Sequence, residues 1–111
     1  MNDLSHLKQR YEQDEPPIQL GGLASNLSRI AWYAQRADQA GLVSLLRESK
    51  YFTEWAAPRC SLEQQGLLAE LQLQLAIWER GVANRIRASR IAQEAKQWSA
   101  KLLDVSGLVR P

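Results

Sequence analysis

The sequence contains one cysteine, Cys60, and one histidine, His6, among its 111 residues. A lone cysteine excludes a disulfide within the chain and every metal or redox motif that takes two cysteines from one chain. A lone histidine leaves no Glu-x-x-His pair for a metal site and only His6 as a histidine base for a cysteine nucleophile. We therefore expect no catalytic, metal-binding or cofactor-binding residue and a protein that is not an enzyme.

Long apolar runs are also missing, because Gln, Glu or Arg interrupts each apolar stretch. None approaches the roughly 20 residues needed to cross a bilayer. The first residues, MNDLSHLKQRYEQDEPP, lack the basic start, apolar stretch and small-residue cleavage site of an export signal. With 45% hydrophobic and 23% charged residues, the composition is that of an ordinary globular protein. The sequence predicts one small cytoplasmic domain without membrane contact.

Positive charge is concentrated near the C-terminus, although the formal net charge is only +2. Residues 1–79 carry seven basic and ten acidic side chains, and residues 80–111 carry seven basic and two acidic ones. Arginines at a helix start can grip phosphate or carboxylate groups. The stretch ERGVANRIRASR therefore gives a candidate anion-binding set: Arg80, Arg85, Arg87 and Arg90.

The alternative for these arginines is a solvated face that pairs with Glu70, Glu79 or Glu94. A nucleic-acid protein would carry a larger net charge and aromatic residues among the basic ones. Here the first aromatic residue after the arginines is Trp98, which we place in the core. Nucleic acid is therefore the less favoured partner.

Apolar residues spaced three and four apart predict helices over residues 20–38, 42–56, 61–81 and 85–105. The boundaries are inferred from capping and breaking residues, which are Gly41, Pro58, Ser61 with Gln64, Gly81, Asn84 and Gly107. For the last helix the predicted inward residues are Ala88, Ile91, Ala95, Trp98, Leu102 and Val105.

Residues 1–19 have the weakest secondary-structure signal in the chain. Pro16 and Pro17 block helix continuation and favour extended geometry. A short helix over residues 3–12 is compatible with the spacing of its apolar residues, and it could dock as an N-terminal arm. A frayed tail is the alternative.

The stretch ELQLQLAIW, residues 70–78, alternates like a strand but consists of good helix formers within a capped helix. As a helix it is apolar on two sides, because Leu73 and Ile77 lie opposite the main stripe that contains Leu71 and Leu75. A single bundle normally covers one side of each helix. We therefore expect Leu73 and Ile77 to form a homodimer contact or to receive the N-terminal arm, the alternative being two solitary surface residues.

The four tryptophans divide into inward and outward ones. Trp78 and Trp98 lie on predicted inward stripes, where core packing explains them. Trp32 points outward with arginines one turn away on either side, a combination favoured in protein contacts.

Tyr51 and Trp55 also lie off the main stripe of their helix. They could share an outward aromatic patch with Trp32. The alternative is that these rings pack against the N-terminal segment.

The combination SLLRESKYFTEWAA, LAELQLQLAIW and WSAKLLDVSGL resembles a group of small uncharacterised helical proteins of cyanobacteria. The likeness covers residues 20–109 and includes particular residues such as Glu48, Ser49, Trp55 and Ser106. It implies a bacterial cytoplasmic setting and carries no activity or ligand.

Together these patterns predict an all-α protein, an antiparallel four-helix bundle over residues 20–111 with an N-terminal arm or short extra helix over residues 1–19. The expected function is a small non-catalytic interaction or adaptor protein, self-associating as a homodimer, with Leu73, Ile77 and Trp32 as contacts. The alternative function is weak nucleic-acid or anionic-ligand binding through the segment 80–90.

Overall fold

The structure, a computed structural model, describes residues 3–83 and 88–108 and is all-α, without a strand in these ranges. The α-helices and one short 3-10 helix, η1, are α1 (Asp3–Glu12), α2 (Pro16–Gln35), α3 (Gln39–Ala56), η1 (Ala57–Arg59), α4 (Leu62–Ala83) and α5 (Ala88–Ser106).

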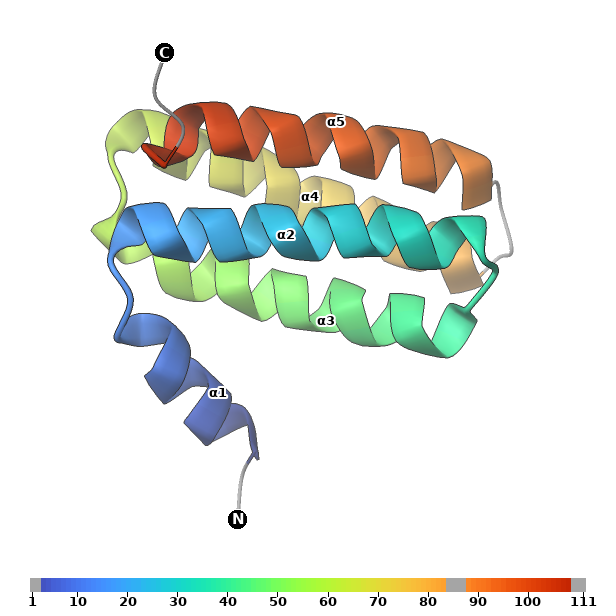
Figure 1. Ribbon diagram of the computed structural model, residues 1–111, viewed down its shortest axis with the longest axis horizontal. Helices are drawn as coiled ribbons and strands as arrows, with labels where there is room; N and C mark the ends of the chain where they lie inside the picture. The colour runs from blue at the N-terminus through green and yellow to red at the C-terminus, as the bar shows by residue number, and fades with distance from the viewer. Residues whose placement is uncertain (1–2, 84–87, 109–111) are drawn as a thin grey trace.

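Helices α2 to α5 lie side by side and each runs opposite to the one before it (Figure 1). Helix α2 packs most extensively against α5 and then against α3, and α4 packs against α3. Helices α2 and α4 therefore occupy diagonal positions. Helix α1 projects away from the long helices and contacts α3.

Small residues bring α2 and α5 together. Ala24 and Ala31 on α2 and Ala92 and Ala95 on α5 are buried, and small side chains at a helix contact let the axes approach closely. The Ser99 hydroxyl donates a 2.8 Å hydrogen bond to the carbonyl oxygen of Ala24. This contact requires a small polar residue at position 99.

The inward face of α5 agrees with the prediction in part, because Ile91, Ala95 and Leu102 are buried as predicted. Ser99 and Ser106 are buried, whereas Trp98 and Val105 are half-buried and Ala88 is exposed. The prediction of Trp98 as a core residue holds only in part, since its ring is half-buried. Trp98 packs at the edge of the core.

Helices α4 and α5 are spaced more widely, and Trp78 lies between them. Trp78 is 2% exposed, and its indole Nε1 donates a 3.0 Å hydrogen bond to the Glu94 carboxylate of α5. A large side chain with one polar atom thus spans a gap that the small residues of α5 leave open.

Several of the helix starts and ends differ from the prediction. Helix α2 begins at Pro16 rather than near residue 20, because proline suits the first turn of a helix, where its missing N–H has no partner to lose. Gly41 does not end α2. It lies in the first turn of α3, where its N–H donates to the Asp38 side chain at 3.0 Å.

The turn between α2 and α3 is made by Ala37, which has a left-handed backbone conformation with φ of 55°. The N–H groups of Ala37 and Asp38 donate to the carbonyl oxygens of Ala34 and Tyr33, the bonding pattern that closes many helices. Any side chain at position 41 would meet the Tyr33 ring, since an added Cβ would lie 2.8 Å from it. This close approach explains the glycine.

The capping box of α4 is confirmed. The Gln64 N–H donates to the Ser61 hydroxyl at 3.1 Å, and the Ser61 N–H donates to the Gln64 side chain at 2.9 Å. Gly81 does not end α4, which continues to Ala83, and the predicted cap Asn84 lies outside the described residues. Gly107 follows α5 with a φ of 89°, as its predicted role requires.

The predicted apolar stripes of α2 and α3 are confirmed. The buried residues of α3 are Leu42, Leu45, Leu46, Ser49, Phe52, Thr53 and Ala56. All seven follow the spacing of three and four from which the helix over residues 42–56 was predicted. The period of hydrophobic residues was therefore sufficient to orient both helices.

Helix α1 forms as the predicted short helix, and Tyr11 fastens it. The Tyr11 ring stacks on Phe52 with 4.0 Å between centroids. Its hydroxyl donates to the Gln19 carbonyl oxygen at 2.7 Å, and the Gln19 side chain donates back to the Tyr11 carbonyl oxygen at 2.9 Å. The Arg59 guanidinium also donates to the carbonyl oxygens of Glu12, the last residue of α1, and of Asp14.

We expect this docking to weaken in alkali. Burial, with smaller contributions from Cys60 and Asp14, raises the pKa of the Tyr11 hydroxyl above its ordinary value of 10.0. Below about pH 10 the hydroxyl is neutral in the folded and unfolded chain, and its stabilisation is complete. Above about pH 10 the unfolded chain loses the proton first, so the free energy of unfolding should fall as pH rises.

Urea unfolding at about pH 8 and about pH 11 measures this loss, with m values used to check that the transition stays two-state. The matched variant is Tyr11→Phe, which keeps the stacked ring but has no proton to lose. It should be less stable than the native chain at pH 8 and lose less stability between the two pH values. Equal losses in both proteins would show that Tyr11 does not cause the pH dependence.

Candidate functional site: the outer face of helix α4

Three of the large apolar side chains that the described residues expose lie on one side of α4. Leu62, Leu73 and Ile77 are 86%, 66% and 54% exposed. The prediction that Leu73 and Ile77 point away from the core is confirmed. Since α1 packs against α3 and both residues remain exposed, the prediction that the N-terminal arm covers them is wrong.

These residues belong to a longer stripe. At 100° per residue, positions 62, 66, 69, 73, 76, 77 and 80 fall within about 100° of the helix circumference. All of them are exposed, and we call them the α4 outer face, which comprises Leu62, Gly66, Ala69, Leu73, Ala76, Ile77 and Arg80.

Sequence reasoning missed Leu62, Ala69 and Ala76 as members of this face. Their signal is the spacing of four and three that connects them to Leu73. Small residues are weak hydrophobic signals, and the main stripe of α4 masks them. The same face carries Arg80, which is exposed at its C-terminal end.

Trp32 does not extend the α4 outer face. It is 49% exposed on α2, which lies diagonally across the molecule from α4. The guanidinium carbon of Arg36 lies 3.8 Å from the centre of its ring, and the Tyr33 ring meets it edge-on at 5.0 Å. Trp32 is thus a separate surface feature whose ring is partly covered by its own neighbours.

The prediction of an aromatic patch shared by Trp32, Tyr51 and Trp55 is wrong. Trp32 lies near the C-terminal end of α2, whereas Trp55 lies near the C-terminal end of the oppositely directed α3. Trp55 contacts Tyr11 of α1 at 6.2 Å and stacks on Tyr51 at 5.5 Å. The alternative, packing against the N-terminal segment, describes Trp55 correctly.

The candidate arginines do not form one described cluster. Arg85 and Arg87 lie outside the described residues. Arg90 pairs with Glu94 one turn away at 3.3 Å, as expected for a solvated helix face. Arg80 is exposed on α4.

Glu48 and Glu54 of α3 lie in different surroundings. The Glu48 carboxylate accepts a 3.0 Å hydrogen bond from Asn26, and Glu54 is exposed. Burial raises the pKa of the Cys60 thiol, against a smaller lowering by Arg59, so the thiol is protonated at neutral pH. Within the described ranges, histidine, cysteine, aspartate and glutamate form no group of three or more that could hold a metal ion.

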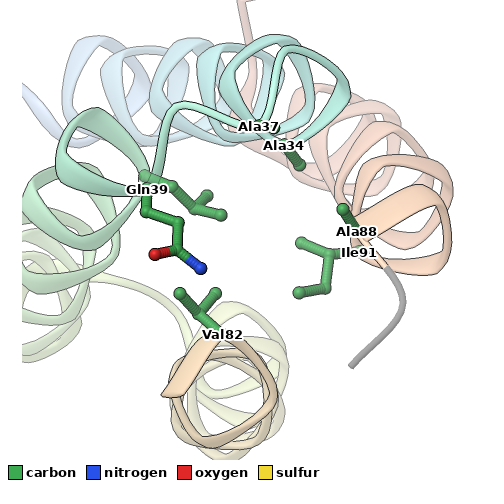
Figure 2. A pocket seen from close by; sticks show the side chains of 7 residues that line it. Ala34, Ala37, Gln39, Val82, Ala88 and Ile91 are labelled. Atoms are coloured by element: carbon green, nitrogen blue, oxygen red, sulfur yellow. The ribbon is translucent and has the colours of Figure 1, made fainter. Parts of the chain in front are cut away.

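A cavity of about 360 Å³ lies at the end of the bundle near the α2–α3 turn. Figure 2 shows the Gln39 side chain extending into it toward Val82. Its described lining residues are Ala34, Ala37, Gln39, Leu42, Val82, Ala88 and Ile91. None of these side chains is charged or titratable, so they supply no acid, base or nucleophile.

Among the described helices, none combines the length and apolar character that spanning a membrane would take. Comparison with family models, curated proteins and solved structures finds no match to this chain. The resemblance to small helical proteins of cyanobacteria therefore stays a prediction, and the α4 outer face is the feature on which a function can be argued.

Proposed function

We propose that the protein is a small antiparallel four-helix bundle with a docked N-terminal helix, and that it acts through protein contact rather than catalysis. Its α4 outer face is the self-association surface. The observation that carries this proposal is the exposure of Leu73 and Ile77, 66% and 54%, on a helix whose other side already packs into the core.

The energetics favour a covered face. Fully burying a leucine or isoleucine side chain contributes about 1.5–3 kcal/mol. Two copies would bury six such side chains, which are Leu62, Leu73 and Ile77 from each. Leu73 and Ile77 are already partly covered in the single chain, so the gain is below six times this value, but it is of the same order as the cost of association, about 4–15 kcal/mol. Contiguous apolar surface on a monomer is moreover a known mark of interaction sites.

Trp32 supports a second contact with a different protein. Its position on α2, diagonal to α4, leaves it accessible when the α4 outer faces of two copies meet. A tryptophan beside an arginine is typical of the residues that anchor protein contacts.

Charges placed on the α4 outer face should dissociate the dimer. The double variant Leu73→Glu, Ile77→Glu would force four carboxylates into an apolar contact. The free energy needed to desolvate them is larger than the contact can offset. Sedimentation velocity should show the native chain approaching twice its monomer mass of 12.6 kDa at high concentration, and the double variant remaining at 12.6 kDa.

The matched control adds the same two charges on α2 by Ile18→Glu, Ser25→Glu, since both residues are exposed. This variant should associate like the native chain. If the native chain stays monomeric at about 1 mM, well above the range of weak specific dimers, the proposal is wrong. It is also wrong if the α4 double variant associates as strongly as the native chain.

A further inference from the structure

We propose that two copies of this chain pair through their α4 outer faces in antiparallel orientation. The two-fold axis crosses the contact at the level of residue 71 along α4. This inference rests on the proposed self-association and adds its geometry. It specifies which residue of one copy meets which residue of the other.

The spacing along α4 is that of a helix-pairing seam. The residues at 62, 66, 69, 73, 76 and 80 follow alternating steps of four and three, and all are exposed. This spacing keeps one line of side chains facing a partner helix over several turns. A helix of about 22 residues spans about 33 Å, so the seam covers most of its length.

The sizes of the seam residues fit an antiparallel partner. Antiparallel pairing about position 71 sets Leu73 of each copy against Ala69 of the other, and Gly66 against Ala76. The large Leu73 thus meets the small Ala69, as close packing requires. Parallel pairing would set Leu73 against Leu73, two large side chains at one level.

Gly66 supports the close approach. A Cβ built at Gly66 meets no other atom within 4 Å, so nothing within its own chain requires glycine there. Opposite Ala76 of a second copy, the missing side chain lets two backbones come together.

Charge favours the same orientation. The N-terminal half of α4 carries Glu63 and Glu70, and its C-terminal end carries Arg80, all exposed. Antiparallel pairing brings Arg80 of each copy beside Leu62 and within reach of Glu63 of the other. Parallel pairing would set Arg80 against Arg80 within the seam, which is repulsive.

One contact opposes the antiparallel pair. Glu70 of each copy would lie near Glu70 of the other beside the axis. These carboxylates flank the seam and can turn to water, so their repulsion is weaker than that of two arginines inside it. This feature predicts that neutralising Glu70 strengthens the dimer.

We expect a contact made by one helix face of each copy to be smaller than a standard interface, which buries about 800 Å² on each partner. We therefore expect a dissociation constant on the order of tens of micromolar. Cross-linking by introduced cysteines suits such a weak dimer, because the covalent bond records the orientation even when the dimer is short-lived.

The experiment uses the full chain with Cys60→Ser and adds either Gly66→Cys or Ala76→Cys. Each variant alone should form little disulfide dimer under mild oxidation, and an equal mixture of the two should form a covalent heterodimer. Parallel pairing predicts the reverse, since each variant would then link to itself. Far-UV circular dichroism checks that both variants retain the helices.

Charge variants give an independent measurement. Arg80→Glu or Glu63→Arg alone should weaken the dimer roughly three- to tenfold, and the two together should restore it to within about twofold. Glu70→Gln should tighten it roughly two- to fivefold. If Arg80→Gln strengthens the dimer instead of weakening it, the antiparallel arrangement is wrong.

These outcomes test the proposed orientation separately from the proposed self-association. A native chain that never dimerises overturns both proposals. A native dimer in which Gly66→Cys links efficiently to itself overturns the antiparallel geometry and leaves the α4 outer face as the contact. A native dimer in which neither the single variants nor the mixture cross-link overturns this pairing as well.

Discussion

Replacing Trp78 by alanine is expected to lower the free energy of unfolding by about 3–5 kcal/mol. Trp78 is 2% exposed and occupies the space between α4 and α5, whose backbones lie too far apart for smaller side chains to meet. The substitution leaves a cavity and removes the donor that bonds the Glu94 carboxylate at 3.0 Å. A half-buried carboxylate then loses a charge-assisted hydrogen bond in addition to the lost packing.

Trp32→Ala is the matched control, because it deletes the same side chain at a position that is 49% exposed. It should cost about 1 kcal/mol or less, since it removes only the contacts of the ring with Arg36 and Tyr33. Urea unfolding followed by circular dichroism measures both variants. Equal losses would mean that Trp78 does not hold α4 and α5 together.

The sequence was sufficient for most of the fold because the signals of α2, α3 and α4 are local. Their apolar residues recur at the helix period, and the side chains of Ser61 and Gln64 bond only to their own helix start. Such features act over one or two turns. They can be recognised without knowing which helix packs against which.

The inward face of α5 was predicted only in part, with Ile91, Ala95 and Leu102 but without Ser99 and Ser106. Its orientation depends on a contact with α2 in which Ser99 bonds to the Ala24 carbonyl oxygen. From the sequence alone, a serine is a surface residue and a tryptophan a core residue. Close packing of two helices reverses this preference, and only the tertiary contact shows it.

Only part of the candidate site could be predicted from the sequence. Leu73 and Ile77 are large apolar residues, so their position opposite the main stripe was clear from the helix period. Gly66, Ala69 and Ala76 have too little apolar surface to show a second stripe. Their importance follows from exposure along the whole of α4, which is a property of the folded chain.

Leu71→Ala and Leu73→Ala, two identical substitutions two residues apart, are expected to differ strongly in effect. In a strand, residues two apart share a face, but on a helix they point about 200° apart. Leu71 is fully buried and Leu73 is 66% exposed. Leu71→Ala should therefore lower the free energy of unfolding by about 2–5 kcal/mol, and Leu73→Ala should change it by about 0.5 kcal/mol or less.

Both variants are to be unfolded at a low concentration, about 1 µM, where a dimer with a dissociation constant of tens of micromolar is fully dissociated. At high concentration, where self-association is measured, Leu73→Ala should have the larger direct effect. Leu73→Ala should weaken self-association because it removes the side chain that fits against Ala69 of the second copy, and Leu71→Ala should affect it only through folding. A Leu73→Ala variant that loses stability as a monomer but associates normally would place Leu73 in the core and leave α4 without an outer contact surface.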